Sequence, residues 1–129
     1  FGEMRSCALL AKGVAQRADA APAATVLGMA TLNGAKALGL GDRIGSLVTG
    51  KEADVICVDL SAAATQPVYD PVSQLVYATS RDQVSDVWVA GRQLLADHQP
   101  LVADAPAILA RAESWRARLS AARGSVAHD

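Results

Sequence analysis

A hydrolytic metal site needs several histidine, carboxylate or cysteine side chains that converge on one ion. The histidines of this chain are His98, which follows Asp97 in a predicted loop, and His128, close to the C-terminus. The sequence contains no His-x-His pair and no HExxH helix. We therefore expect no metal site and no catalytic residue in this chain, and we interpret both histidines as solvated surface residues.

Nucleophilic catalysis is not indicated by the residue spacing either. The sequence has no GxSxG turn that would expose a serine nucleophile. Cys7 precedes Ala-Leu-Leu and Cys57 lies between Ile56 and Val58, so we expect both to be reduced thiols in a core. A disulfide would imply an oxidising compartment, and no signal peptide is visible, so the expected location is the cytoplasm.

Two aspartates flank a predicted buried strand, and either could act as a general base. We favour the other interpretation, in which Asp54 and Asp59 accept hydrogen bonds from backbone N–H groups of turns. Lys51 follows Gly50 as it would in a phosphate-binding loop. The glycine spacing fits neither GxGxxG nor the Walker pattern, so we predict a turn there.

The composition argues against two classes of partner. The chain has 129 residues, of which 51% are hydrophobic and 19% charged, and its formal net charge is −1. These proportions are typical of a packed domain, and they give no concentrated basic surface for a nucleic acid. No apolar run approaches the roughly 20 residues that span a bilayer, so we expect no membrane partner.

The spacing of apolar residues predicts helices in the first third of the chain. Over Glu3–Arg17 the apolar residues fall on one face at three- and four-residue intervals. Pro22 suits the first turn of a second helix, which we expect to run through Leu32. Asn33 then predicts the N-cap of a short helix over Gly34–Leu38.

One strand and one hairpin are predicted in the middle of the chain. Ala53–Leu60 is the clearest strand, and its consecutive apolar residues predict that both of its faces are covered. The hairpin pairs Val84–Val89 with Arg92–Leu95, and we expect a type I turn with a left-handed bulge at Gly91. These strands are too few for a self-sufficient sheet, so we expect partner strands from elsewhere in the polypeptide.

Two further helices are indicated by aspartate caps. Asp70, followed by proline, begins a short helix that ends near residue 77. Asp104 begins the last helix, whose apolar stripe at four- and three-residue spacing runs from Ile108 to Ala122, and we expect the helix to end at Gly124. We expect Trp88 and Trp115 to fill the core between the hairpin and this helix.

Several segments carry a family resemblance. They are FGEMR at Phe1–Arg5, MATLNGAKALGL at Met29–Leu40, IGSLVTGKEADVICVDL at Ile44–Leu60, PVYDPVSQLVYA at Pro67–Ala78 and VWVAGRQLL at Val87–Leu95. Together they resemble the C-terminal third of the TRZ/ATZ branch of the metal-dependent amidohydrolases. FGEMR and PVYDPVSQLVYA are most similar to the deaminases of 5-methylthioadenosine and S-adenosylhomocysteine.

The resemblance implies an α/β fold of which this chain is the C-terminal portion. The expected parts are the last outer helices of a (β/α)8 barrel over residues 1–41, the C-terminal strands of a flanking composite β-sandwich over 42–102, and a terminal helix and tail over 103–129. The chain begins at Phe1 without an initiator Met. We expect roughly 300 residues to precede it, supplying the barrel and the N-terminal strands.

The resemblance also implies chemistry that lies outside this chain. In the family a zinc-type ion, held by an HxH pair, two further histidines and an aspartate, activates a water that attacks C6 of an adenine ring. We therefore expect zinc or another divalent metal in the complete enzyme, and neither metal nor activity in this chain alone. Only Phe1–Met4 is expected to lie close to the site, with Phe1 at the rim that a small nucleoside-like substrate would contact.

Alternatives stay open within the family and outside it. The substrate could instead be an s-triazine or chlorinated ring, or a guanine-type base. From a different class, the chain could be a free-standing structural module without catalysis. Family members are often homo-oligomers, and no interface is readable from the sequence.

Overall fold

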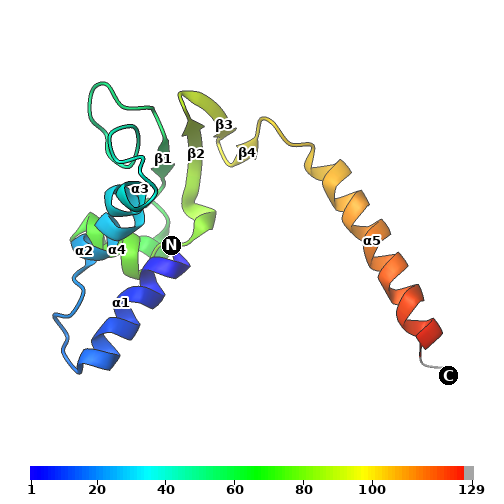
Figure 1. The fold of residues 1–129 in the computed structure, drawn as a ribbon, viewed down its shortest axis with the longest axis horizontal. Coiled ribbons are helices and arrows are strands. Elements are labelled where there is room, and N and C mark those ends of the chain that lie inside the picture. The colour runs from blue at the N-terminus through cyan, green and yellow to red at the C-terminus, as the bar shows by residue number, and fades with distance from the viewer. Residues whose placement is uncertain (127–129) are drawn as a thin grey trace. The chain divides into compact units, whose positions relative to one another are not determined.

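The chain folds into two compact units. The computed structural model describes residues 1–126; the first unit covers residues 1–99, and the second begins at Pro100. The first unit contains helices α1–α4 gathered beside β1 and β2, and the second contains α5 (Figure 1). The elements in chain order are α1 (Gly2–Ala15), α2 (Ala23–Gly28), η1 (Met29–Asn33), α3 (Gly34–Ala37), β1 (Val55–Val58), η2 (Ala63–Thr65), α4 (Pro71–Tyr77), η3 (Arg81–Gln83), β2 (Val84–Val89), β3 (Arg92–Ala96), β4 (Gln99–Pro100) and α5 (Ala105–Val126).

A small apolar core joins α1, α2 and α4. Ala8, Val26 and Val76 are each at most 1% exposed, and Met4 packs against them. Burying such side chains is the main favourable contribution to folding. The apolar face predicted for the first helix is therefore buried in its first half, whereas Val14 in the second half is 86% exposed.

Helices α2, η1 and α3 form one uninterrupted helix. Asn33 has helical angles (φ −71°, ψ −37°) and its side chain makes no capping hydrogen bond, so the predicted N-cap is wrong. Over Met29–Asn33 the helix widens into a π-helical turn, and the Thr31 hydroxyl donates to the Leu27 carbonyl at 2.8 Å. The chain accommodates this segment by a wide turn instead of a new helix start.

The loop after α3 packs its backbone directly against this helix at Gly45. Gly45 has φ +87°, and a Cβ at this position would lie 2.7 Å from the Ala35 Cβ and 2.9 Å from the Leu32 Cα. Only a residue without a side chain fits both the positive φ and this close approach.

Two cationic side chains close the same loop. Lys51 Nζ donates to the carbonyl of Gly41 and, at 3.3 Å, to that of Ile44. Arg43 pairs with Glu52 through Nε at 2.9 Å and through a second guanidinium nitrogen. Lys51 therefore lies in a turn, as predicted, and its ammonium is used to hold the loop together.

The four strands form one sheet in the order β1-β2-β3-β4, with β1 antiparallel to β2 and β2 antiparallel to β3. The first strand covers Val55–Val58, which is shorter than the predicted Ala53–Leu60. Ile56 is 51% exposed and Cys57 is also exposed, so the described residues by themselves do not cover both faces of this strand. As the first strand in the order, β1 lies at an edge of the sheet.

The turn between β2 and β3 has two residues, and it differs from the prediction. Ala90 and Gly91 both have positive φ, 48° and 76°, which is the geometry of a type I′ turn. Asp54 Oδ1 accepts from the Ala90 N–H at 2.7 Å, and the Ala53 carbonyl accepts from the Gly91 N–H at 3.0 Å. These bonds from a distant segment hold an alanine in a conformation that asparagine or glycine usually takes.

The cap of α4 is formed as predicted. The Asp70 carboxylate accepts from the N–H groups of Val72 at 3.3 Å and Ser73 at 3.1 Å, and from the Ser73 hydroxyl. Pro71 occupies the first helical position, where no N–H is needed. The Ser73 hydroxyl first, and then the two N–H groups, hold the pKa of Asp70 below its usual range.

The second unit consists mainly of α5. The Asp104 carboxylate accepts from the Ala107 N–H at 3.0 Å, which confirms the predicted cap. The helix runs past Gly124, so its predicted end is wrong; a single glycine costs only about 1 kcal/mol in a helix. Trp115 is 55% exposed, contrary to the expectation that it fills a core. His128 lies outside the described residues.

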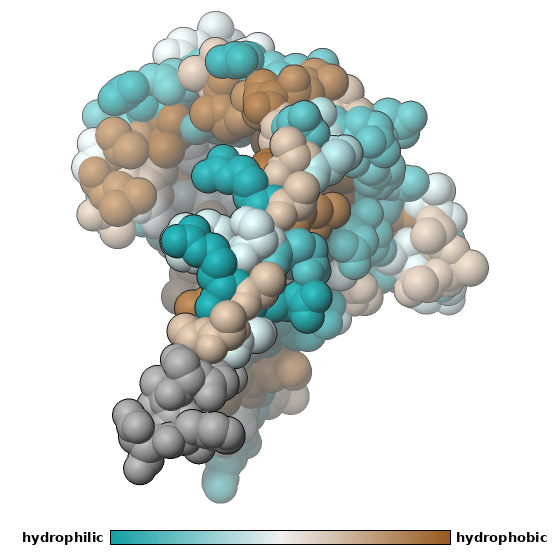
Figure 2. All heavy atoms as spheres, turned by 90° about the vertical axis from the view of Figure 1, so that its right-hand side faces the viewer, coloured by the Kyte–Doolittle hydropathy of each residue, from teal (hydrophilic) through white to brown (hydrophobic). Residues whose placement is uncertain are grey.

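These elements give the α/β class that was predicted. Large apolar side chains nevertheless lie on the surface of the first unit, including Leu47, 79% exposed, and Tyr69, 92% exposed; hydrophobic surface is visible as brown areas in Figure 2. Among residues 1–126, no helix combines the length and apolarity needed to cross a membrane.

The close approach at Gly45 predicts a large difference between two glycine variants. Gly45→Ala adds backbone strain and a clash with the helix, and should lower the free energy of unfolding by about 3 kcal/mol or more. Gly50 also has a positive φ, +95°, but a Cβ there meets nothing within 4 Å. Gly50→Ala should therefore cost only about 1–2 kcal/mol. Urea unfolding of both variants is the measurement, and equal losses would contradict the packing argument.

The Asp70 cap predicts a pH dependence with a defined sign. Because the folded pKa of Asp70 is lowered, its charge stabilises the folded state above about pH 4, and this contribution is lost as the pH falls through the folded pKa. Asp70→Asn keeps an acceptor but no charge. This variant should therefore be less stable than the parent at neutral pH, and the two stabilities should converge in acid. Asp70→Ala should stay less stable than both at every pH. Thermal unfolding from pH 3 to pH 7 tests this order.

Candidate functional site

The predicted site residue, Phe1, lies immediately before α1. It is half-buried, and its carbonyl accepts from the Arg5 N–H at 3.0 Å in the first turn of the helix. Any pocket contact by Phe1 therefore depends on how firmly α1 is held in place.

Arg5 fixes the N-terminal half of α1 to the end of α4. One guanidinium nitrogen donates to the Thr79 carbonyl at 3.0 Å, across 74 residues of sequence. Thr79 is fully buried, and its hydroxyl donates to the Gln74 carbonyl at 2.9 Å, so the acceptor is itself held rigidly. The Arg5 Nε is buried and has no hydrogen-bond partner in the described chain, so one donor of this guanidinium is unsatisfied there.

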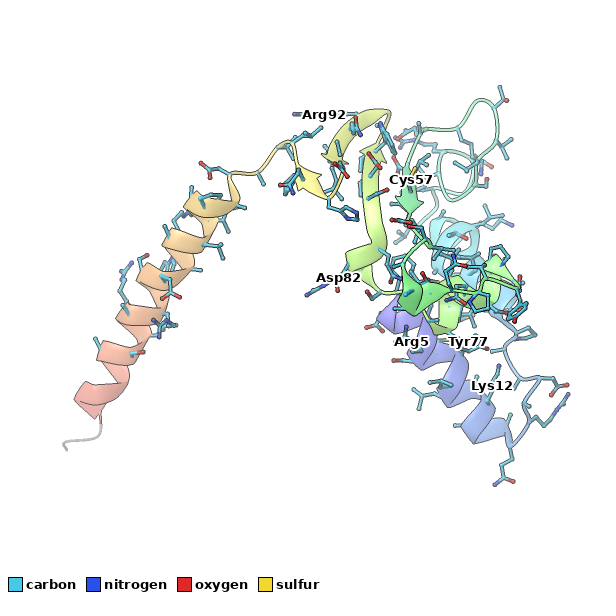
Figure 3. All side chains as sticks on the ribbon, turned by 180° about the vertical axis from the view of Figure 1, so that it is seen from behind. Arg5, Lys12, Cys57, Tyr77, Asp82 and Arg92 are labelled. Carbon is cyan, nitrogen blue, oxygen red and sulfur yellow. The ribbon has the colours of Figure 1, made fainter. Side chains whose placement is uncertain are left out.

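Lys12 holds the other end of the same helix. Its Nζ donates to the carbonyls of Ala20 at 2.6 Å and Ala21 at 3.2 Å, and it lies 5.7 Å from the centre of the Tyr77 ring (Figure 3). A cation over an aromatic ring is attracted to its negative face. Lys12 and Arg5 thus fasten α1 to the α2 connection and to α4, and sequence reasoning identified neither role.

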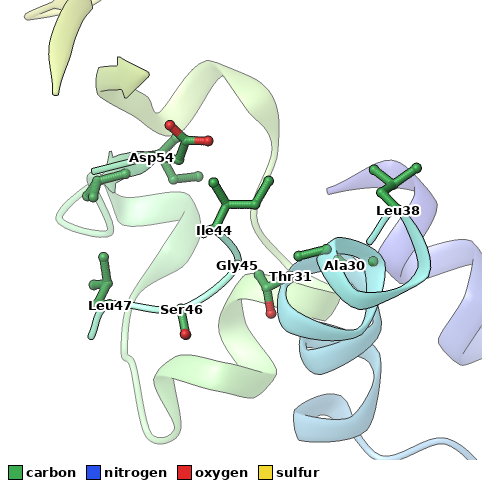
Figure 4. Close-up of a pocket in the computed structure, with 12 residues that line it drawn as sticks. Ala30, Thr31, Leu38, Ile44, Gly45, Ser46, Leu47 and Asp54 are labelled. Carbon is green, nitrogen blue, oxygen red and sulfur yellow. The ribbon is translucent and has the colours of Figure 1, made fainter. Parts of the chain in front are cut away.

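An open hollow of about 530 Å³ lies between the helix 29–38, the loop 44–47 and β1. Figure 4 shows Thr31 and Leu38 on the helix and Ile44 and Leu47 on the loop. The carboxylate of Asp54 also borders the hollow, but it is already bonded to the hairpin backbone. The hollow therefore offers an apolar surface, suited to packing and without a group free to act as a base.

The candidate ligands for a metal are not brought together. The described residues contain no group of three or more histidine, cysteine, aspartate or glutamate side chains able to hold an ion. Cys7 is half-buried and Cys57 exposed, and both are free thiols. His98 is exposed in the turn after β3, as predicted. By themselves these residues do not fit a metal centre.

The flanking aspartates have structural roles, which is the interpretation favoured from the sequence. Asp54 accepts from the backbone of the hairpin turn. Asp59 Oδ1 accepts from the Ser61 N–H at 2.7 Å. The hydroxyl and the N–H of Ser61 hold the pKa of Asp59 below its ordinary value, so this carboxylate is a poor base at neutral pH.

Comparison with known sequences gives a consistent family assignment. A family model described as "Amidohydrolase family" matches residues 1–94. A 5-methylthioadenosine/S-adenosylhomocysteine deaminase from Teredinibacter turnerae is 47% identical over 123 residues, which is 95% of this chain and 28% of that protein. A protein of the same name from Saccharophagus degradans is 42% identical over 97% of this chain, again covering 28% of its own length. The chain thus spans little more than a quarter of these relatives.

Solved structures agree with this assignment. A zinc-bound adenosine deaminase from Xanthomonas campestris is 52% identical, with a TM-score of 0.90 over 93% of this chain and 27% of its own. A zinc complex of atrazine chlorohydrolase from Arthrobacter aurescens is 30% identical, with a TM-score of 0.79 over 88% of this chain and 25% of its own. The family match, the sequence identities and the shared fold lead to one conclusion: the chain belongs to the amidohydrolase family.

Proposed function

We propose that this chain is the C-terminal region of a hydrolase that removes ammonia from the adenine ring of a nucleoside such as 5-methylthioadenosine or S-adenosylhomocysteine. The observation that carries the proposal is the 47% identity, over 95% of the chain, to a deaminase of that name. The structure with a TM-score of 0.90 is named as an adenosine deaminase, which supports the same substrate class.

In this proposal the chain supplies structural elements around the active site and one residue at the rim of its pocket. The reacting groups would lie elsewhere in the polypeptide. Residues 1–41 would form the last outer helices of a barrel, 42–102 the C-terminal part of a composite sandwich, and 103–129 a terminal helix and tail. The fastening of α1 by Arg5 and Lys12 would hold Phe1 at the edge of the pocket. The chain alone would then be inactive.

The proposed metal would be held by residues outside this chain. The described residues contain no cluster of ligands, whereas three of the similar structures are named as zinc-bound. We infer zinc or another divalent ion for the complete enzyme on the basis of these relatives. The cytoplasmic location stays a prediction.

A second candidate is a triazine hydrolase of the same family. It is supported by the atrazine chlorohydrolase, which is 30% identical with a TM-score of 0.79. An Escherichia coli guanine deaminase matches less well, at 27% identity and a TM-score of 0.57. Sequence identity and TM-score both fall from the adenosine deaminase to the triazine hydrolase to the guanine deaminase, and this order favours the adenine-type substrate.

Substrate profiling of the complete protein tests the proposed function. We expect ammonia release from 5-methylthioadenosine and S-adenosylhomocysteine, and about one divalent ion per polypeptide by elemental analysis. Dialysis against a chelator should abolish turnover, and added zinc should restore it. Atrazine and guanine are the comparison substrates. Preferred turnover of either one would contradict the adenine assignment, and a protein that is metal-free and inactive on all of them would favour a structural module.

The rim position of Phe1 predicts a selective kinetic effect in the complete enzyme. Phe1→Ala removes an apolar contact made equally to substrate and transition state, so KM for the nucleoside should rise about tenfold while kcat changes little. Val14→Ala, at the other end of the same helix, is the matched control and should leave both constants unchanged. A fall in kcat with unchanged KM in the Phe1 variant would contradict the rim role.

A further inference from the structure

The sequence contains a single asparagine, Asn33, and a glycine, Gly34, follows it directly. We call these two residues the Asn-Gly pair. In such a pair the backbone nitrogen of the glycine can attack the Cγ of the asparagine, because glycine has no side chain that obstructs the approach. The pair is therefore a place where the chain can modify itself without an enzyme.

The reaction consumes only water. The bond between the Gly34 nitrogen and the Asn33 Cγ forms, the Cγ–Nδ2 bond breaks, and ammonia leaves with the proton of the Gly34 N–H. Water then opens the resulting succinimide ring at one of its two carbonyl carbons, and the ring nitrogen takes up a proton. The product is aspartate, or isoaspartate in which the main chain runs through the former side chain.

The structure places the Asn-Gly pair inside the uninterrupted helix that α2, η1 and α3 form. The succinimide ring closes only when the Gly34 nitrogen eclipses the Asn33 Cβ about the Cα–C bond. The ψ of −37° at Asn33 turns the nitrogen away from that position. The Gly34 N–H also donates to the carbonyls of Met29 and Thr31. The closed helix therefore blocks the attack by its geometry and by engaging the attacking group.

Only the backbone provides this protection. Asn33 is exposed, and its side chain makes no capping hydrogen bond. The helix ends at Ala37, about one turn beyond the pair, and helix ends open more readily than their centres. The Gly45 loop packs against Leu32 and Ala35, the residues on either side of the pair. Opening of the helix at the pair therefore separates it from the Gly45 loop.

We propose that the Asn-Gly pair is a modification site that the closed helix protects and that local opening of the helix exposes. The reaction proceeds from the open helix alone, at a rate set by the population of the open form. Isoaspartate adds one carbon to the main chain, so the helical hydrogen bonds around residue 33 and the Gly45 contact do not re-form. Opening thereby becomes irreversible, and it does so independently of the proposed deaminase activity.

Deamidation kinetics of the complete protein measure the protection. Peptide mass spectrometry follows Asn33 in mildly alkaline buffer, and digestion in water enriched in heavy oxygen marks any conversion that occurs during digestion. We expect Asn33 to react at least about tenfold more slowly in the protein than in a synthetic peptide of residues 27–40.

The ratio of these two rates should equal the open fraction that amide hydrogen exchange gives for residues 33–37 in the same buffer. Equal rates in protein and peptide, or a ratio well above the open fraction, would overturn the proposal.

Two glycine variants test whether the Gly45 contact keeps the helix closed. Gly45→Ala should react several times faster than the parent, because its Cβ clashes with Leu32 and Ala35 and favours the open helix. Gly50→Ala is the matched control, since a Cβ there meets nothing within 4 Å, and it should keep the parent rate. Equal acceleration in both variants, or in neither, would contradict the role of the contact. Should Gly45→Ala not fold, the comparison of rate with open fraction in the parent still decides the proposal.

Hydrogen exchange on aged protein reveals the fate of the helix. Isoaspartyl and unmodified peptides separate by chromatography, so both forms are read in one sample. Residues 30–37 should exchange fully in the isoaspartyl form and stay protected in the unmodified form. Asn33→Asp carries the same charge without the extra main-chain carbon, and this control should also stay protected. Retained protection in the isoaspartyl form would refute irreversible opening.

Discussion

The arrangement of the first unit depends on the contact between the Gly45 backbone and the helix that α2, η1 and α3 form together. There the loop passes so close to Leu32 and Ala35 that no side chain fits between them. From this point the loop 46–54 leads into β1, which pairs with β2. The position of the sheet relative to the helices is therefore set by a backbone contact, and the Arg43–Glu52 and Lys51 contacts keep the intervening loop closed.

Three cationic side chains of this unit bind backbone carbonyls and so connect one segment to another. Arg5, Lys12 and Lys51 each donate to backbone carbonyls at the ends of helices or turns. Hydrogen bonds from charged donors are stronger than neutral ones, and they satisfy carbonyls that helix and turn ends leave unpaired. The same side chains in a cleft would suggest anion binding. Their partners in this structure are instead backbone carbonyls, so these side chains hold helices and turns together.

The features that the sequence predicted are those decided by neighbouring residues. The caps at Asp70 and Asp104 and the two hairpin strands follow from residues a few positions apart, and the structure has all of them. The turn at Ala90 was mispredicted because its geometry is held by Asp54, 36 residues away.

The other differences between the sequence predictions and the structure also have long-range causes. Asn33 carries the sequence signal of an N-cap, but the helix continues through it because a π-turn accommodates the segment. The expected cover over Ile56 is not supplied by the described residues, in which this side chain is 51% exposed. Of the candidate site, the sequence offered only Phe1, and its role at a pocket rim stays a prediction. The roles of Arg5 and Lys12 were not readable from the sequence, because backbone carbonyls as acceptors leave no residue pattern.

The hairpin tip has a consequence for how this region can change during evolution. The two turn residues are matched, one to one, by the Asp54 carboxylate and the Ala53 carbonyl of the neighbouring segment. An inserted or deleted residue at the tip would shift this pairing and leave the positive-φ alanine without support. Length variation among homologues should consequently be concentrated in other connections, such as residues 61–69, while the tip retains two residues even where their identities differ.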